Sequence, residues 1–529
     1  MNLVIGSGPA GIACAHGLLA QGESVTLIDA GLTLELPQRE ALARLQNGFE
    51  QSAFDRLTQF HSKILITKMG IPLKTAYGSD YSYREADERL GLKREGTGLM
   101  ASLAVGGLST VWGATALPYA QRDIADWPIT QHDLAAHYEA VLKTTGLTAK
   151  VDDLAATFPL YTERPIEPRL SSQASRFLGA LDADKSGLNR DGIIYGRSRL
   201  MVSTGKRTGQ SCVFCGQCLY GCPYELIYNS GNEIASLMAL GGDRFKYETN
   251  LIVERVKESG TGVEMGGTQR FTGESVTMPG DRAFLAAGVI PTAKIVLNSL
   301  DHYDRTVNLL DSQYFLFPIV SLRGNSSATT EELQTLSQLF LEINDAEISP
   351  FTVHLQAYTY SDIVTKTLLR KFWFLPVLRN LLVRNLDHRI IIVQGYLHSS
   401  HSGHMEMRLT RDAANPGKDQ FTVRGVPGAE TRQRIRKVIR KLAGHLTGKG
   451  YFPVEQALEI SEPGRSFHSG GSFPMRNQPR DLETDKYGRV AGQSRIHLAD
   501  ASTFPSIPTT TITLTAMANA HRIAVTSPR

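Results

Sequence analysis

Four of the five cysteines of this 529-residue chain lie within one short run. They are Cys212, Cys215, Cys218 and Cys222. Their spacing, C-x2-C-x2-C-x3-C-P, is typical of thiolates that hold an iron–sulfur cluster. Zinc sites usually draw on two cysteine pairs with a longer spacer, and disulfides are rare in chains that fold in a reducing compartment. The run therefore predicts a metal site, with an iron–sulfur cluster as its favoured occupant.

A glycine-rich turn follows the first apolar run of the chain, residues 2–5. Gly6, Gly8 and Gly11 form a GxGxxG pattern before an apolar helical stretch, and Asp29 ends the next apolar run. This context is the one that dinucleotide binding requires, because the glycines let the backbone approach a pyrophosphate and the carboxylate accepts a hydrogen bond from a ribose. The alternative is a plain βαβ turn that uses glycine for packing. The motif does not distinguish NAD from FAD.

Two later segments must complete the scaffold around this motif. Residues 282–288, RAFLAAG, predict a buried strand, and an amphipathic helix follows. Residues 495–524 predict a strand that ends at Asp500, a proline-punctuated loop and a helix of small residues.

With these segments the chain resembles the glucose–methanol–choline (GMC) family of FAD-dependent oxidoreductases, which oxidise alcohols. The resemblance rests on the N-terminal motif, the turn VGGLSTVWGA at 105–114, the LAAG segment and the stretch from His468 onward. It implies FAD rather than NAD as the cofactor. The FAD-binding residues that it implies are Gly6, Gly8, Gly11, Asp29, Gly106, Gly107, Ser109 and Asp500.

The same resemblance implies the catalytic residues. In RSFHSGGSFPM, residues 465–475, His468 occupies the position of the family's catalytic histidine. An imidazole suits the task of a general base that takes the hydroxyl proton while the hydride goes to flavin N5. The family's second histidine or asparagine falls on Thr511, whose hydroxyl can orient a substrate but is a poor proton acceptor.

The region between the LAAG segment and His468 predicts strands at 347–360 and 389–400. In the second strand Gln394, Tyr396 and His398 alternate onto one face, which would present polar groups to a sugar or polyol. A half-exposed sheet without a ligand is the alternative. His398, His401 and His404 recur at three-residue spacing in a Ser/Gly-rich segment without a supporting carboxylate, so we do not expect these histidines to bind a metal.

Residues 368–386, LLRKFWFLPVLRNLLVRNL, interleave bulky apolar side chains with Arg370, Lys371, Arg379 and Arg384. As a helix this stretch would suit a membrane surface or a partner protein. A core-facing helix with a basic solvent side and a kink at a proline is the alternative.

Composition excludes several classes of protein. The net charge of +4 is spread along the chain and predicts no nucleic-acid partner. No apolar run is long enough for a spanning helix, and a strand that starts at residue 2 leaves no room for a signal peptide. We therefore expect a cytoplasmic protein, membrane-peripheral at most, that is exported only with a signal-bearing partner.

The cysteine run places the chain near the iron–sulfur-containing branch of bacterial sugar and polyol dehydrogenases within the family. Related glucose dehydrogenases use C-x5-C-x3-C for a three-iron (3Fe-4S) cluster, which Cys212, Cys218 and Cys222 match. Cys215 is an additional candidate ligand, so a 4Fe-4S cluster is the alternative. Because a cluster takes one electron at a time, it predicts a dehydrogenase that passes electrons to a cytochrome, a small redox subunit or a quinone.

The resulting prediction is an α/β protein with a Rossmann-type FAD-binding domain and an inserted α+β substrate domain. The first comprises residues 1–120, 200–310 and 465–529, with the cysteine loop at 212–223, and the second comprises 121–199 and 311–464. We expect an FAD-dependent dehydrogenase for a CH–OH group of a sugar, glycoside or polyol. The alternatives are an oxygen-using GMC oxidase and a non-catalytic electron-transfer or redox-sensing flavoprotein.

Overall fold

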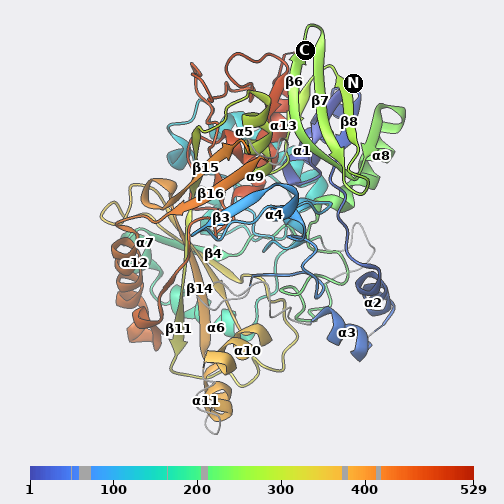
Figure 1. Cartoon of the computed structure of the whole chain (residues 1–529). Coiled ribbons are helices and arrows are strands. Elements are labelled where there is room, and N and C mark those ends of the chain that lie inside the picture. The colour runs from blue at the N-terminus through green and yellow to red at the C-terminus, as the bar shows by residue number, and fades with distance from the viewer. Residues whose placement is uncertain are drawn as a thin grey trace.

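The computed structural model describes residues 1–48, 50–58, 73–163, 165–203, 212–371, 379–412 and 419–528 (Figure 1). Among them, no helix is long and apolar enough to cross a membrane. The two ends of the chain lie together at the start of β9, where Arg282 Nη1 donates to Ser527 Oγ (3.2 Å) and the Met1 amino group pairs with Asp281.

A parallel five-stranded sheet carries the glycine motif. Its order is β20 (Ile496–Leu498), β9 (Ala283–Leu285), β1 (Asn2–Ile5), β2 (Val25–Ile28) and β5 (Phe245–Glu248). β1 and β2 are buried at every residue, as expected for parallel strands covered on both faces. Helices α1 (Pro9–Ala20) and α13 (Ile512–Thr526) pack against each other, and Gly17 allows close contact because a Cβ there would lie 2.9 Å from that of Ala524.

The antiparallel strands β6 (Leu251–Ser259), β7 (Gly262–Gln269) and β8 (Ser275–Gly280) form a separate sheet near both termini (Figure 1). Helix α9 (Val289–Ser299) packs against β6 and shares a core with the parallel sheet.

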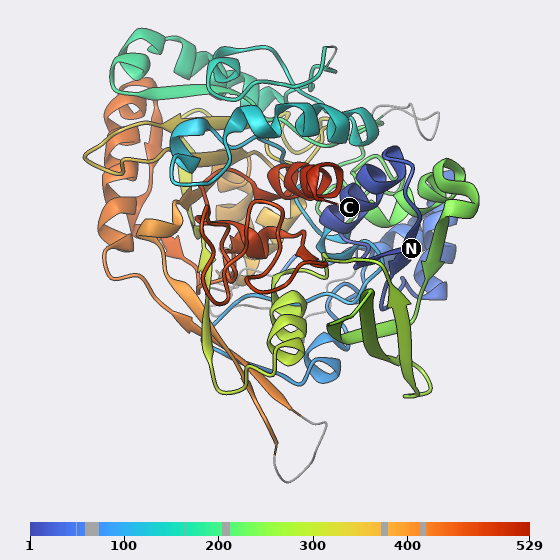
Figure 2. The ribbon, with the colours of Figure 1, turned by 90° about the horizontal axis from the view of Figure 1, so that it is seen from above.

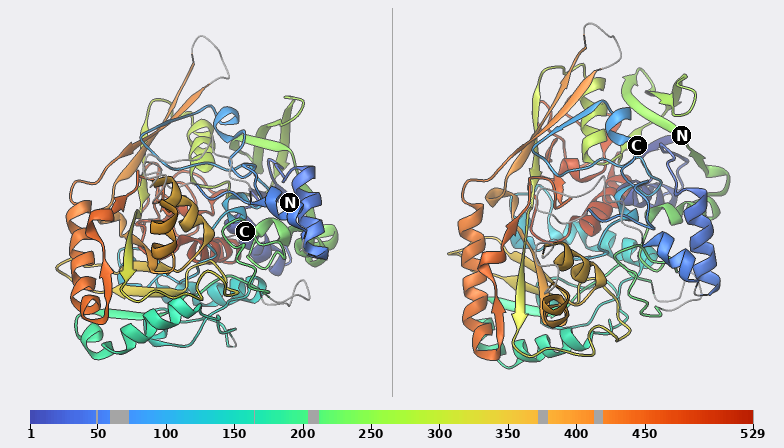
Figure 3. Two further views of the ribbon diagram at one scale, coloured as in Figure 1. Left: turned by 90° about the horizontal axis from the view of Figure 1, so that it is seen from below. Right: turned by 60° about the horizontal axis from the view of Figure 1, so that its bottom comes forward.

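A seven-stranded sheet forms the floor of the second half. It contains β17 (Tyr451–Pro453), β11 (Gln313–Ser321), β14 (Ile390–Leu397), β13 (Val353–Tyr358), β12 (Leu339–Ile343) and β4 (Ile193–Arg197), with β18 (Glu459–Ile460) also paired to β11. One face is covered by α12 (Thr431–Leu446), whose apolar residues recur at helical spacing and pack on Phe315, Phe317 and Val393 (Figure 3).

A fourth sheet connects the two halves and holds the His468 loop. Its order is β19 (Ser469–Gly470), β10 (Thr306–Asp311), β15 (His404–Thr410), β16 (Gln420–Val426) and β3 (Leu92–Glu95). β15 and β16 reach outward from the body of the molecule (Figure 2). The other helices are α2 (Leu36–Asn47), α3 (Gln51–Leu57), α4 (Ala86–Arg89), α5 (Gln131–Thr145), α6 (Ser172–Asp182), α7 (Lys185–Arg190), α8 (Ile234–Gly241), α10 (Asp362–Lys371) and α11 (Arg379–Leu386).

The predicted α/β class with a parallel Rossmann-type sheet and a second, mixed part is confirmed, whereas the exact domain boundaries stay a prediction. The stretch 368–386 is not one helix: its described residues belong to α10 and α11. The predicted kink at Pro376 lies outside the described residues.

Candidate active site

One cavity of about 780 Å³ brings together most of the predicted site residues. Its walls come from the carboxyl ends of the parallel strands, residues 99–115, one face of the seven-stranded sheet and the start of α13. The predicted residues that line it are Gly6, Gly8, Asp29, Gly107, Ser109, Gln394, Tyr396, His468, Asp500 and Thr511.

The glycine motif has two different roles in the structure. A Cβ on Gly8 would meet nothing within 4 Å, so this backbone is open to the cavity. A Cβ on Gly11 would lie 1.8 Å from the Gly6 carbonyl oxygen, so Gly11 is needed for packing rather than for ligand contact. Gly8 caps α1 without a side-chain cap, which leaves backbone N–H groups at the positive end of this helix for a pyrophosphate.

Asp29 is fixed at the end of β2. Its carboxylate accepts hydrogen bonds from the backbone N–H of Ser7 (3.0 Å) and Gly31 (2.6 Å) and from the Ser7 hydroxyl. Burial raises the pKa of Asp29, and these hydrogen bonds oppose that shift. Ser7, which the sequence analysis did not single out, also accepts the Gly106 N–H (2.9 Å) and so joins the motif to the second glycine turn.

That second turn depends on glycine at its first position. Gly106 has φ +88°, and a Cβ there would lie 2.3 Å from Asn229 Oδ1, so Gly106 does not line the cavity but shapes the turn. Ser109 Oγ donates to the Gly106 carbonyl (2.6 Å), which closes the turn and leaves Gly107 facing the cavity next to Gly8.

Asp500 lies at the N-terminus of α9. Its carboxylate accepts from Gly288 N (3.0 Å), Thr292 Oγ1 (2.6 Å) and Ser502 N (3.0 Å). Burial raises its pKa, and the hydrogen bonds oppose the shift. The open glycine backbone, the helix N-terminus and the two carboxylates thus fit the donors and acceptors of FAD.

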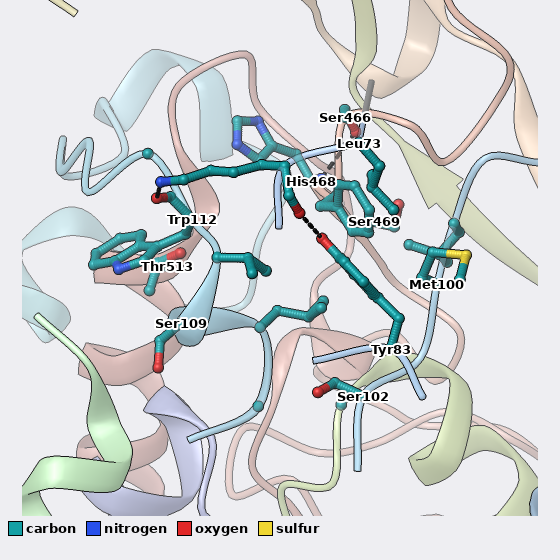
Figure 4. Close-up of a pocket in the computed structure, with 18 of the residues that line it drawn as sticks. Leu73, Tyr83, Met100, Ser102, Ser109, Trp112, Ser466, His468, Ser469 and Thr513 are labelled. Atoms are coloured by element: carbon teal, nitrogen blue, oxygen red, sulfur yellow. Dashed lines mark hydrogen bonds between the residues drawn. The ribbon is translucent and has the colours of Figure 1, made fainter. Parts of the chain in front are cut away.

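His468 lies beside Ser466 and Ser469 in the cavity wall, with Ser109 farther along the pocket (Figure 4). Its ring stacks on Tyr396, with centroids 4.6 Å apart and an interplanar angle of 25°. Nδ1 is buried and has no hydrogen-bond partner among the described residues. Burial, followed by the nearby His354, lowers the pKa of His468 to about 3. The imidazole is therefore neutral at physiological pH and has the lone pair that a general base needs.

Asp311, at the end of β10, holds the loop that carries His468. Its carboxylate accepts from Gly464 N (2.8 Å), Ser466 Oγ (2.7 Å) and Ser469 Oγ (3.0 Å), and Ser466 Oγ in turn accepts the His468 backbone N–H (2.8 Å). Burial raises the pKa of Asp311 to about 6. The sequence analysis missed this residue, because nothing in the chain near position 311 marks it.

Thr511 is the N-cap residue of α13, and its Oγ1 accepts the Leu117 N–H at 3.3 Å. Its hydroxyl lies in the cavity wall where the resemblance places the second catalytic residue.

The cavity floor is the face of the seven-stranded sheet opposite α12. Gln394 and Tyr396 line it, together with Gln356 and Tyr358 of the neighbouring strand β13. The Gln394 amide has no hydrogen-bond partner recorded within the described ranges. His398 was predicted on the same face but does not line the cavity: it follows the end of β14 and stacks on Phe351 with centroids 3.7 Å apart. No metal-binding group occurs there within the described part of the chain.

Helix α10 closes part of the cavity. Its residues Ile363, Val364, Thr367 and Leu368 line the wall, which accounts for the apolar side of this helix. Arg384 of α11 is exposed. A peripheral membrane contact through 368–386 stays a prediction.

The cysteine loop adjoins the same cavity. Its residues Leu219 and Tyr220 line the cavity wall, and Cys218 packs in a small cluster with Trp112, which also lines the cavity. The buried Lys74 donates to the Trp112 carbonyl oxygen (2.6 Å). Burial lowers the pKa of Lys74 to about 8, while Cys218 and Cys222 raise it.

The cysteine sulfurs have chemistry that suits a cluster. Burial raises the pKa of Cys212, Cys215 and Cys222, and backbone N–H groups on their sulfurs oppose the shift, three of them on Cys222. Such N–H groups also stabilise the thiolates of iron–sulfur clusters. However, no three potential ligands among the described residues are arranged to hold a metal ion.

Comparisons with known proteins agree with this geometry. Residues 416–520 match the family model described as GMC oxidoreductase. Pyridoxine 4-oxidase from Mesorbium loti has a similar structure, with a TM-score of 0.60 over 99% of this chain and 98% of that chain; at 13% identity this match shows the fold. No match was found among curated proteins. The family model places residues 416–520, the C-terminal part of the chain, among the GMC oxidoreductases, and the cavity with its open glycine backbone and buried carboxylates fits the FAD of such enzymes, which act on CH–OH groups.

Proposed function

We propose that the protein is an FAD-dependent dehydrogenase that oxidises a CH–OH group of a sugar, glycoside or polyol. The observation that carries this proposal is the neutral imidazole of His468, whose buried Nδ1 has no hydrogen-bond partner among the described residues and which adjoins a sheet face with polar side chains. FAD, when bound, supplies the hydride acceptor. His468 takes the hydroxyl proton, and the Asp311-anchored loop keeps the imidazole in place.

The remaining residues position the alcohol. Tyr396 holds the His468 ring by stacking, and the Gln394 amide in the cavity wall can both donate to and accept from substrate hydroxyls. Thr511 offers a hydroxyl in the cavity wall, whereas Tyr396 and the apolar side of α10 exclude water.

The finer part of the proposal is an electron exit at the cysteine loop. The loop forms part of the cavity wall, and backbone N–H groups already point at three of its sulfurs. A cluster held there would accept single electrons and serve a cytochrome, a small redox subunit or a quinone. An oxygen-using oxidase is the second candidate, and the observation that favours it is the structural similarity to pyridoxine 4-oxidase.

Anaerobic purification under iron-replete conditions distinguishes the two candidates. Iron and acid-labile sulfide are counted against FAD, and an EPR spectrum is recorded. The dehydrogenase predicts three or four irons per FAD and turnover with an artificial dye. Cys218→Ser should abolish the cluster signal, whereas Cys14→Ala, which alters a buried thiol in α1, should keep it. Iron-free protein that turns over with oxygen would establish the oxidase instead.

A further inference from the structure

A chain of hydrogen bonds leads from the protein interior to the cavity through residues that no step above uses. His354, Gln356 and Tyr358 alternate along one face of β13, and Glu342 lies opposite His354 on β12. Glu342 and His354 are fully buried, whereas Gln356 and Tyr358 line the cavity. The chain therefore connects a buried carboxylate to a phenol oxygen at the site.

The donors and acceptors of this chain run in one direction. The Tyr358 hydroxyl donates to Gln356 Oε1 (3.0 Å), the Gln356 amide lies 3.0 Å from His354 Nε2, and His354 Nδ1 lies 2.7 Å from Glu342 Oε1. An amide NH2 only donates, so His354 Nε2 must accept and its hydrogen must be on Nδ1, where the carboxylate accepts it. The carboxylate thereby fixes the histidine tautomer, the glutamine orientation and the tyrosine proton in turn.

The same chain is packed against the proposed base. Tyr396 lies opposite His354 on the neighbouring strand, and its ring stacks on both His354 (centroids 5.9 Å apart) and His468 (4.6 Å). Gln356 is the cross-strand neighbour of Gln394. Burial raises the pKa of Tyr358, and the Ser337 hydroxyl near it opposes the shift, so the phenol keeps its proton at physiological pH.

Because the Tyr358 hydroxyl donates its hydrogen to Gln356 Oε1, the phenol oxygen can only accept a hydrogen bond from a ligand in the cavity. The Tyr358 oxygen lies close to Gly113, whose Cβ, if present, would be 3.6 Å away, and both residues line the cavity. We propose that Tyr358 is a specificity-determining residue that accepts a hydrogen bond from a second substrate hydroxyl, one that is not oxidised. Gln356, His354 and Glu342 are positioning residues that hold Tyr358 in this acceptor state. The inference rests on the proposed function and deepens it, because it assigns recognition of a hydroxyl that is not oxidised to one residue, Tyr358.

The test compares a polyol that reduces the flavin with its deoxy analogue, which keeps the reacting hydroxyl and lacks the second one. Tyr358→Phe removes one oxygen and should lower kcat/KM for the polyol roughly 5- to 150-fold, with less than about a twofold change for the deoxy analogue. Glu342→Gln should reduce the same preference, because an amide at 342 no longer fixes the His354 tautomer. Tyr451→Phe, a tyrosine of β17 that packs on the α12 side of the sheet, is the matched control.

The binding constant of the polyol to the oxidised holoenzyme, read from the flavin spectrum, provides a second measurement that does not need turnover. Weaker polyol binding by Tyr358→Phe, with FAD content and deoxy binding unchanged, supports the inference. Equal losses for both alcohols, or no loss for either, would overturn it while leaving the dehydrogenase intact. If no alcohol bleaches the flavin, the proposed function itself fails.

Discussion

Because His468 is neutral in the folded protein, the stability of the protein should depend on pH by a predictable amount. The experiment compares the thermal stability of the parent holoenzyme with that of His468→Gln at pH 7.5 and at pH 5. Burial lowers the pKa of this imidazole from 6.5 to about 3 in the folded state. A group whose pKa is lowered by folding contributes stability that is present above its unfolded pKa and is lost as the pH falls below it.

The magnitude depends little on the folded pKa. At pH 5 an unfolded histidine is almost fully protonated and the folded one is not. The free energy of unfolding of the parent should therefore fall by about 2 kcal/mol more than that of His468→Gln between pH 7.5 and pH 5. With an unfolding entropy of about 2 cal/mol/K per residue, the difference corresponds to a melting-temperature shift of about 2 °C for a chain of this size.

Thermal unfolding followed by flavin fluorescence at both pH values measures this difference. His132→Gln, at an exposed position on α5, controls for the loss of a solvated histidine. If the melting temperatures of His468→Gln and of the parent decrease equally between pH 7.5 and pH 5, the imidazole titrates alike in the folded and unfolded chain, and the lowered pKa of His468 is refuted.

The other predictions concern the cofactor cradle and the His468 loop. Gly8→Ala should fold normally but retain less FAD, because its Cβ enters open cavity space. Gly11→Ala should also lower the melting temperature of the apoprotein, because its Cβ would lie 1.8 Å from a carbonyl oxygen. The FAD-to-protein ratio and the melting temperature of the apoprotein distinguish the two variants. His468→Asn should slow flavin reduction by about 10²- to 10⁴-fold in anaerobic stopped flow, and a smaller loss would exclude it as the base. Asp311→Ala leaves three donors without their acceptor and should destabilise the protein by about 3 kcal/mol or more in urea unfolding. Asp485→Ala, which removes the part-buried acceptor of the Arg489 guanidinium, serves as a control that should cost less.

Motifs that are local in sequence predicted several of the residues that line the cavity. The turn around Gly8 is specified within a few residues, because a strand, tight glycines and a helix N-terminus must follow one another to bind a pyrophosphate. The alternation of Gln394 and Tyr396 also placed both on the cavity face, since period two is a property of the strand itself. The prediction that His398 lies on the same face was wrong, because β14 ends at Leu397 and side chains alternate between faces only within a strand.

Residues that act through distant partners were missed. Asp311 is unremarkable until β10 pairs with β19 and brings Ser469 beside it. Glu342 and His354 become a pair only when β12 and β13 align in register. The alternating polar residues of VHLQAY at 353–358 were a usable signal, because three hydrogen-bonding side chains on one face of a buried strand need partners.

The order of the parallel sheet has a consequence for biosynthesis. Of the strands in this sheet, β1 is synthesised first and β20 last. β20 completes the sheet next to β9, and almost the whole chain separates β20 from β1 in the sequence. At 5–20 residues per second, roughly 25–100 s pass between the synthesis of these two strands. During this time the segment that carries Asp500 and the helix that covers α1 do not yet exist. Stable binding of the cofactor must therefore wait until β20 and α13 have been synthesised.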